Sequence, residues 1–282
     1  MKKIIKKIIA QIWTYYAISK PKNIIYDNGK METIISKNRQ TLREKSVWIT
    51  DNTISKSVFN YGIPQRVMHL LNNEIGDEIT NTDLLIYLCS LLKQKVNYLE
   101  LGVSVGKNFL QITNSLHNSL LVGFDIEEIN PNLEEHFKKK SFVEWETSTR
   151  SIKKSNSSLT EYIDENNSNI VKYLSGDILD ENSWQKLNEH KFNLVFSDAL
   201  HDPNALLFEF KMIQKYKLLN NDEFIIMWDD LGGEMTISFM KIWFELKRKY
   251  NLRKKNMFMI NLRGWLGVNE AYHTYGVIHF EK

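Results

Sequence analysis

The chain has 282 residues, of which 43% are hydrophobic and 12% aromatic. This composition can bury a sizeable core, so we expect a globular protein with one large domain or a domain plus an extension. The 37 basic and 34 acidic residues give a net charge of +3, too balanced to require a nucleic-acid or membrane partner. The single cysteine, Cys89, excludes an intrachain disulfide framework and a multi-cysteine zinc site. Its apolar surroundings predict a buried structural thiol.

The chain begins with MKKIIKKIIAQIWTYY, in which lysine pairs alternate with isoleucine pairs at helical spacing. A secretory signal needs an unbroken apolar core of about 7 to 15 residues, which the second lysine pair interrupts. No other stretch approaches the roughly 20 apolar residues of a membrane span. We therefore expect a cytoplasmic protein whose first helix packs on its own domain. Peripheral contact of this helix with an anionic membrane, or with a partner, is the alternative.

We expect two parts of the chain. Residues 1–78 form an N-terminal extension that is helical at its start and otherwise irregular, with a short helical segment at PQRVMHLLNNE. From residue 79 to 282 the pattern becomes that of a regular domain. Asn81 or Thr82 can cap its first helix, which we expect to end near Lys95.

Strands and helices then alternate along the domain. Apolar runs predict seven strands: Val96–Leu101, Leu120–Asp125, Val171–Leu174, Asn193–Ser197, Glu223–Trp228, Met257–Leu262 and Tyr275–Phe280. This alternation indicates a Rossmann-like α/β fold, with a mostly parallel sheet covered by helices on both faces and an antiparallel last strand. A polar segment near residues 146–169 interrupts the pattern, and we expect a surface insertion or a lid over a site.

The first strand runs into a glycine-containing turn, YLELGVSVGKNFLQI. Gly102 lets the chain turn sharply and lets a ligand approach the backbone, while Gly106 lets the next helix start close to the sheet. A dinucleotide fingerprint needs a further glycine, where this chain has Val103 and Ser104. The pattern E-x-G-x-x-x-G, which begins at Glu100, resembles instead the first motif of class I S-adenosylmethionine-dependent methyltransferases.

The ends of the next two strands are similar to the same family. Asp125 ends the second strand, where an acidic side chain can accept hydrogen bonds from both ribose hydroxyls; alternatively it caps the following turn. Asp177, after the third strand, resembles the element that places a carboxylate beside the adenine amino group; alternatively it caps a helix. The resemblance implies a cofactor site made of five residues: Glu100, Gly102, Gly106, Asp125 and Asp177.

Acidic residues also follow the fourth and fifth strands. Asp198 lies in SDALHDP, and Asp229 and Asp230 lie in WDDLGG. Neighbouring parallel strands bring these carboxylates to one edge, where they repel one another unless they are protonated or bind a cation. Oxygen ligands favour Mg²⁺, or Mn²⁺, and the alternative is surface or capping aspartates. His201 is placed to take a proton from a cation-bound hydroxyl, unless it is a structural histidine.

The stretch SDALHDP followed by WDDLGG resembles the metal-dependent class I O-methyltransferases, especially those of the macrocin O-methyltransferase type. The resemblance covers about Thr82 to the C terminus. It implies that the three aspartates hold magnesium and that His201 is the base. Catechol-type relatives are similar but place lysine at the position of His201.

We therefore expect an S-adenosylmethionine-dependent, Mg-dependent O-methyltransferase acting on a hydroxyl of a sugar, glycan or related small molecule. Trp265, Tyr272 and His273 can line the acceptor pocket, although a β-hairpin crossing also explains that segment. No nucleic-acid partner is expected, and self-association is left open. The alternatives are a nucleic-acid or protein methyltransferase, or a non-catalytic module that binds S-adenosylmethionine.

Overall fold

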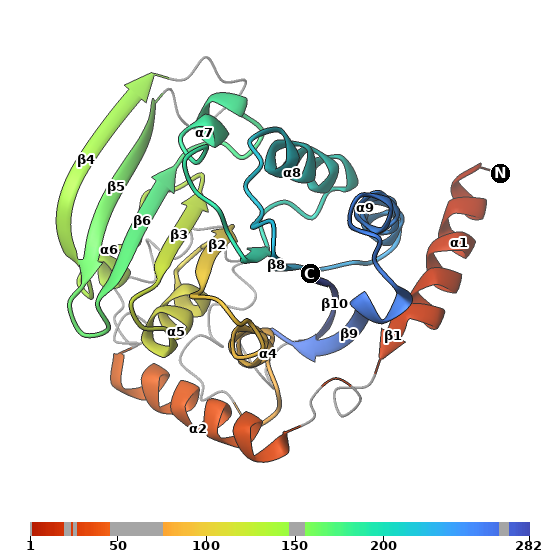
Figure 1. The fold of residues 1–282 in the computed structure, drawn as a ribbon, viewed down its shortest axis with the longest axis horizontal. Coiled ribbons are helices and arrows are strands. Elements are labelled where there is room, and N and C mark those ends of the chain that lie inside the picture. Colours follow the sequence, from red (N-terminus) through yellow and green to blue (C-terminus); the bar gives the residue numbers. More distant parts are fainter. Residues whose placement is uncertain (1, 20–23, 25–26, 46–75, 147–155, 265–270) are drawn as a thin grey trace.

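The computed structural model describes residues 2–19, 24, 27–45, 76–146, 156–264 and 271–282. In these residues a single ten-stranded sheet runs through the molecule (Figure 1). Its strands are β1 (Ile18–Ser19), β2 (Asn97–Leu101), β3 (Leu120–Asp125), β4 (Lys138–Glu146), β5 (Asn156–Asp164), β6 (Asn169–Ser175), β7 (Leu194–Ser197), β8 (Glu223–Trp228), β9 (Met257–Arg263) and β10 (Tyr272–Glu281). The helices are α1 (Lys2–Ala17), α2 (Asn28–Lys45), α4 (Asn81–Cys89), α5 (Lys107–Ser115), α6 (Pro131–Glu134), α7 (Glu181–Gln185), α8 (Pro203–Lys215), α9 (Glu234–Tyr250) and the 3₁₀ helix η4 (Lys254–Asn256).

The strand order in the sheet is β1-β9-β10-β8-β7-β2-β3-β6-β5-β4. The central strands β6, β3, β2, β7 and β8 are parallel, and β10 is antiparallel to its neighbours β8 and β9. All seven strands expected from the sequence are present, and the antiparallel last strand is confirmed. The fold is thus Rossmann-like, and its strand order reverses at β2, with β3 on one side and β7 on the other.

The central strands are buried because their side chains alternate between two hydrophobic cores. Leu99 and Leu101 of β2 pack in the core that contains α8 and α9, whereas Tyr98 packs in the core that contains α4 and α5. Figure 1 shows α7, α8 and α9 along one face of the sheet and α4 and α5 along the other. Cys89 is buried in the second core, as expected, and burial raises the pKa of its thiol to about 12.

The polar segment expected as an insertion near residues 146–169 contains a sheet strand. Residues 156–164 form β5, which pairs antiparallel with β4 on one side and β6 on the other. The described part of the segment therefore widens the sheet and does not form a lid. Its sequence, NSSLTEYID, has no continuous apolar run because this strand lies near the edge of the sheet. Residues 147–155 lie outside the described residues.

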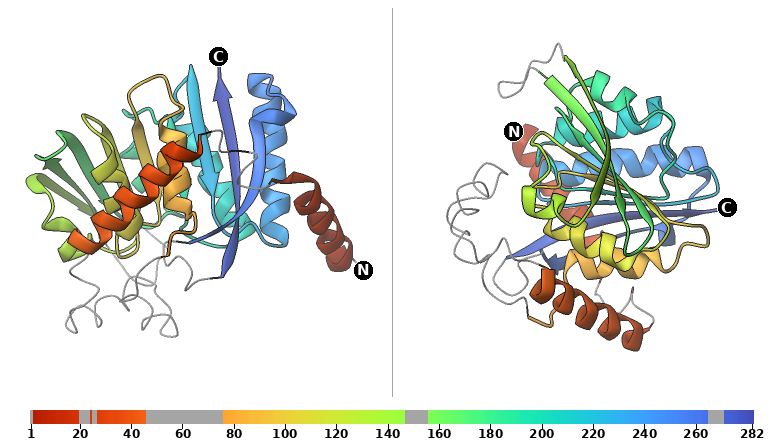
Figure 2. Two further views of the ribbon diagram at one scale, coloured as in Figure 1. Left: turned by 90° about the horizontal axis from the view of Figure 1, so that it is seen from below. Right: turned by 90° about the vertical axis from the view of Figure 1, so that its left-hand side faces the viewer.

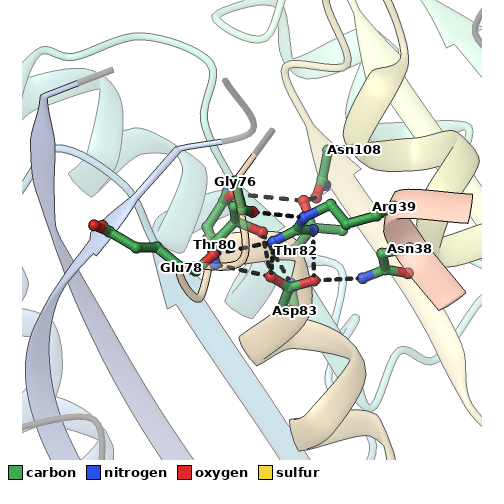
Figure 3. A network of polar contacts seen from close by, with 9 residues as sticks. Asn38, Arg39, Gly76, Glu78, Thr80, Thr82, Asp83 and Asn108 are labelled. Atoms are coloured by element: carbon green, nitrogen blue, oxygen red, sulfur yellow. Dashed lines mark hydrogen bonds and ion pairs between the residues drawn. The ribbon is translucent and has the colours of Figure 1, made fainter. Parts of the chain in front are cut away.

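The N-terminal extension is less irregular than expected, because Asn28–Lys45 forms the 18-residue helix α2. A buried ion pair fixes this helix to the domain (Figure 3). The Arg39 guanidinium donates to both carboxylate oxygens of Asp83, at 3.1 and 2.8 Å, and to the carbonyl oxygens of Gly76 and Glu78. The two charged side chains are 5% and 0% exposed. These charges can be buried because the two side chains form a bidentate pair and the guanidinium donates further hydrogen bonds to backbone carbonyl groups.

Asp83 also lies in the first turn of α4. Thr80 and Asp83 form a capping box, so the helix cap is Thr80 and not Asn81 or Thr82 as expected. The helix ends at Cys89, earlier than the expected end near Lys95. The helical segment expected at PQRVMHLLNNE lies outside the described residues.

None of the helices in the described part of the chain has the length and apolar character that crossing a bilayer requires.

Candidate functional site

A pocket opens at the carboxyl ends of four neighbouring parallel strands, where the strand order reverses. The space between its walls, open solvent included, is about 410 Å³. Residues at the ends of β2, β3, β6 and β7 line it: Gly102, Phe124, Asp125, Ile126, Asp177, Ile178, Ala199 and Leu200. Apolar walls with two carboxylates suit a heterocycle that carries hydroxyl or amino groups.

The turn after β2 forms one side of the pocket. Gly102 has a φ of +82°, and a Cβ there would lie 2.4 Å from the carbonyl oxygen of Asp198. Gly106 has a φ of +87°, and a Cβ would lie 2.4 Å from Cδ2 of Leu133. The positive φ angles favour glycine at both positions, whatever the pocket binds, and at Gly102 the backbone of the loop after β7 also leaves no room for a side chain. Ser104, between them, has a φ of +53°, the left-handed conformation that glycine adopts most easily.

Asp125 lies in the pocket wall and also organises the turns around it. Its Oδ2 accepts hydrogen bonds from the backbone N–H groups of Val103 and Ser104, at 2.7 and 2.8 Å, and its Oδ1 accepts from Glu127 at 3.0 Å. Burial raises the pKa of Asp125, against these three donors, which lower it. A carboxylate has about four acceptor positions, so these bonds leave about one for a ligand hydroxyl. Turn capping and ligand binding, the two alternatives from the sequence, both fit this residue.

The other two carboxylates assigned to the cofactor differ in position. Asp177 lines the pocket, and Asp180 is the N-cap of α7, so Asp177 does not cap that helix. Glu100 is 1% exposed and is not among the described residues that line the pocket. Its Oε2 accepts a hydrogen bond from the Tyr98 hydroxyl at 2.7 Å. Burial raises the pKa of Glu100 to about 8.

The structure brings together the four residues predicted to bind and use a metal. Asp198 follows β7, and Asp229 and Asp230 follow its neighbour β8. His201 lies between two of these aspartates: its Nε2 is 3.0 Å from Oδ1 of Asp198, and its Nδ1 is 2.8 Å from Oδ2 of Asp230. We name these residues, with His273 described next, the acid–histidine cluster.

His273 is a fifth member of the acid–histidine cluster that the sequence suggested only as a pocket-lining residue. Its Nδ1 is 3.2 Å from Oδ2 of Asp229 and 3.0 Å from Oδ1 of Asp230. It is the second residue of β10, and Thr274 accepts a backbone hydrogen bond from Leu231. The antiparallel pairing of β10 with β8 thus sets His273 beside both aspartates. Trp265 lies outside the described residues.

The charges of the acid–histidine cluster partly offset one another. Both ring nitrogens of His201 face carboxylate oxygens, an arrangement that favours the imidazolium form, in which both nitrogens donate. The hydrogen bonds to Asp198 and then Asp230 raise the pKa of His201 to about 10. Burial, with the charge of Asp198, raises the pKa of Asp229 to about 7, whereas hydrogen bonds from the two histidines hold the pKa of Asp230 well below its usual range.

The acid–histidine cluster also has the composition of a divalent-cation site. Ligand atoms of Asp198, His201 and Asp229 lie within 4.8 Å of one another, and so do those of Asp229, Asp230 and His273. Asp229 belongs to both groups. Carboxylate oxygens suit Mg²⁺ or Mn²⁺, and an imidazole nitrogen shifts the preference toward a transition metal. The residues present therefore fit a divalent cation.

The loop after β7 joins the pocket to the acid–histidine cluster. Ala199 and Leu200 line the pocket, and the residues on either side of them, Asp198 and His201, belong to the cluster. Residues 198–201 therefore contribute to both the pocket and the acid–histidine cluster. A ligand in the pocket would lie close to the carboxylates of the cluster.

Comparisons with known proteins find similarity to solved structures at low sequence identity. No family model matches the sequence, and no curated protein matches it. Solved structures are similar at low identity. The O-methyltransferase TomG from Streptomyces achromogenes, in complex with SAM, has 13% identity and a TM-score of 0.46, with 100% of both chains covered. The O-methyltransferase from Bacillus cereus, in complex with SAH, has 12% identity and a TM-score of 0.47, with 95% of this chain and 99% of that chain covered.

Proposed function

We propose that the chain is an S-adenosylmethionine-dependent O-methyltransferase that uses a divalent cation. The loop Asp198–His201, shared by the pocket and the acid–histidine cluster, carries the proposal. It supports a methyl donor in the pocket next to an acceptor hydroxyl at the cluster, the alignment that a direct transfer between two bound molecules requires.

In this proposal the pocket holds the nucleoside part of the cofactor. Phe124, Ile126 and Ile178 provide apolar surface for the adenine ring. Asp177 accepts a hydrogen bond from the adenine amino group, and Asp125 accepts one from a ribose hydroxyl through its remaining acceptor position. Because the sulfonium group already makes the methyl group electrophilic, the protein has chiefly to orient the two reactants.

In this proposal Asp198, Asp229 and Asp230 hold the cation, either Mg²⁺ or Mn²⁺. Asp229 is the carboxylate shared by the two groups of ligand atoms, with Asp198 in one group and Asp230 and His273 in the other. When bound, the cation supplies positive charge that lowers the pKa of a nearby acceptor hydroxyl. His201 is 46% exposed, so it can reach an acceptor that arrives from solvent. If Asp198 and Asp230 hold the cation, they no longer stabilise the protonated form of His201. The neutral imidazole can then accept the hydroxyl proton through one ring nitrogen.

We propose a hydroxyl of a sugar, glycan or related small molecule as the acceptor. Support comes from the half-exposed edge of the acid–histidine cluster, at which the side chains of His201 and Asp230 are 46% and 36% exposed. A vicinal diol can present two oxygens to one cation. A cytoplasmic location belongs to the same proposal, supported by the unpaired, buried thiol of Cys89.

Transfer of a labelled methyl group from S-adenosylmethionine to a panel of sugars, glycolipids and catechols tests this function. We expect turnover that a chelator stops and that Mg²⁺ or Mn²⁺ restores, and we expect Asp229→Ala to behave like chelation. Full activity in excess chelator would disprove the role of the cation. Cofactor binding with methylation only of RNA or protein would favour the alternative acceptors, and binding without any turnover would favour a non-catalytic module.

A further inference from the structure

Helix α1 lies at one end of the molecule, beyond α9, with the N terminus pointing outward (Figures 1 and 2). Among the side chains of α1 that the structure describes, two small ones face the domain. Ala10 is 2% exposed, and the Thr14 hydroxyl lies 3.3 Å from the hydroxyl of Thr236 on α9. Ala10 and Thr14 are four residues apart, so they share one face of the helix.

The opposite face of α1 is apolar and open to solvent. Ile5, Ile8, Ile9 and Ile12 follow the i, i+3, i+4, i+7 spacing of a single helical stripe, which Tyr15 extends. These five side chains are 40–80% exposed: Ile5 49%, Ile8 50%, Ile9 40%, Ile12 50% and Tyr15 80%. Since 3.6 residues make one turn, this stripe lies roughly opposite Ala10. The helix thus turns these five apolar side chains away from its own domain.

The charge of α1 indicates what covers this stripe. Its sequence, KKIIKKIIAQIWTYYA, has four lysines in the first two turns and no Asp or Glu. An apolar stripe on a helix whose charged residues are all lysine is the composition of a helix that lies on an anionic lipid surface. A second copy of α1 would bring more lysines and no acidic residue to pair with them.

We propose that α1 docks the protein onto an anionic membrane surface, with the isoleucine stripe in the headgroup region and the lysines close to the lipid phosphates. The rest of the molecule remains outside the bilayer. This inference rests on α1 alone and is independent of the function proposed above.

Sedimentation of the full-length protein with lipid vesicles tests the proposal. We expect binding to vesicles of half phosphatidylglycerol and half phosphatidylcholine, and at least about tenfold weaker binding to pure phosphatidylcholine. Raising the salt concentration should weaken binding, because salt screens the attraction. Equal binding to both kinds of vesicle, or none to either, would overturn the proposal.

A double variant, Ile8→Glu with Ile12→Glu, tests the stripe itself. We expect it to bind anionic vesicles at least about tenfold more weakly than the wild type. The matched control is Leu91→Glu with Val143→Glu, which adds the same charge at two exposed apolar positions away from α1. Val143 lies on β4, at the opposite edge of the sheet from β1. The control should bind like the wild type, and equal losses in both variants would contradict a specific role for the stripe.

Light scattering after gel filtration distinguishes a second copy from a membrane as the occupant. The proposal expects the same mass for the wild type and the Ile8→Glu, Ile12→Glu variant. A wild-type dimer that this variant dissociates would show that another copy covers the stripe and would overturn the proposal. Thermal unfolding of both double variants confirms that each remains folded.

Discussion

Imidazole and carboxylate groups alternate in the acid–histidine cluster, from Asp198 through His201, Asp230 and His273 to Asp229. Asp230 lies between His201 and His273, and His201 lies between Asp198 and Asp230. The cluster therefore holds itself together through hydrogen bonds between imidazole and carboxylate groups. Three aspartates at one sheet edge do not by themselves require a cation, since the histidines offset part of their charge. The case for a cation rests on the ligand geometry.

The position of His273 predicts that it contributes to cation affinity. Changing His273 to Asn removes the imidazole beside Asp229 and Asp230. We expect the affinity for Mn²⁺, measured by calorimetry or electron paramagnetic resonance, to fall roughly 10–100-fold, the usual effect of losing a group that orients metal ligands. His279→Asn, on the same strand, should leave the affinity unchanged. Unchanged affinity in the His273 variant would remove this residue from the site.

Glu100 predicts a specific pH dependence of stability. Its pKa is raised from 4.5 to about 8 by burial, so between those values the folded chain holds a proton that the unfolded chain has lost. The contribution of Glu100 to stability therefore falls as pH rises through this window. The stability of Glu100→Gln relative to the wild type should rise as the pH increases from about 4.5 to about 8, by an amount on the order of a few kcal/mol, and then stay constant.

Denaturant unfolding at several pH values measures this difference. Glu135→Gln, a change at an exposed carboxylate, serves as the control and should follow the wild type throughout. Parallel curves for Glu100→Gln and the wild type would show that Glu100 is ionised in the folded chain.

The sequence predicts most of the acid–histidine cluster because its members follow strand ends directly. Asp198, Asp229 and Asp230 come immediately after apolar runs, and the parallel sheet brings such positions together. His273 could not be placed in this way, because its position depends on the antiparallel register of β10. The burial of Glu100 also escaped prediction, since a motif gives the order of residues and not the direction of a side chain.

At the scale of elements, buried strands are predictable and edge strands are not. β7 and β8 read as continuous apolar runs because both their faces are covered. The outer strands β4 and β5 have polar sequences. They are strands because they pair with their neighbours, and the sequence pattern does not reveal this pairing. Helix α2 was missed for a related reason: its docking depends on Arg39 and Asp83, which are far apart in the sequence.

The ion pair between Arg39 and Asp83 predicts that α2 is part of the stable domain. Arg39→Ala leaves a buried carboxylate without its partner, so we expect a loss of about 3–5 kcal/mol in the free energy of unfolding. In a chain of this size that loss lowers Tm by roughly 10 °C. Arg43→Ala, at an exposed position on the same helix, should change stability by less than about 0.5 kcal/mol. Similar losses in the two variants would show that the ion pair does not dock α2.

At the scale of the whole molecule, the pocket and the acid–histidine cluster lie at different halves of the sheet. The strand β2 at the reversal point, with β3 and β6 on one side of it, ends at the pocket. On the other side, β8 ends at the acid–histidine cluster and the antiparallel β10 begins there. The loop after β7 lies between them. The fold thus places two sites side by side without any further domain, and α1 and α2 are attached to the outside of this unit.

Binding of S-adenosylmethionine to the pocket is the central claim, and calorimetry on the purified chain tests it most directly. We predict one molecule bound per chain in the wild type and binding weakened at least about tenfold in Asp177→Ala, which removes a carboxylate from the pocket wall. Asp180→Ala, which changes a neighbouring aspartate that caps α7, should bind like the wild type. No heat of binding in the wild type, or equal binding in all three proteins, would contradict the account.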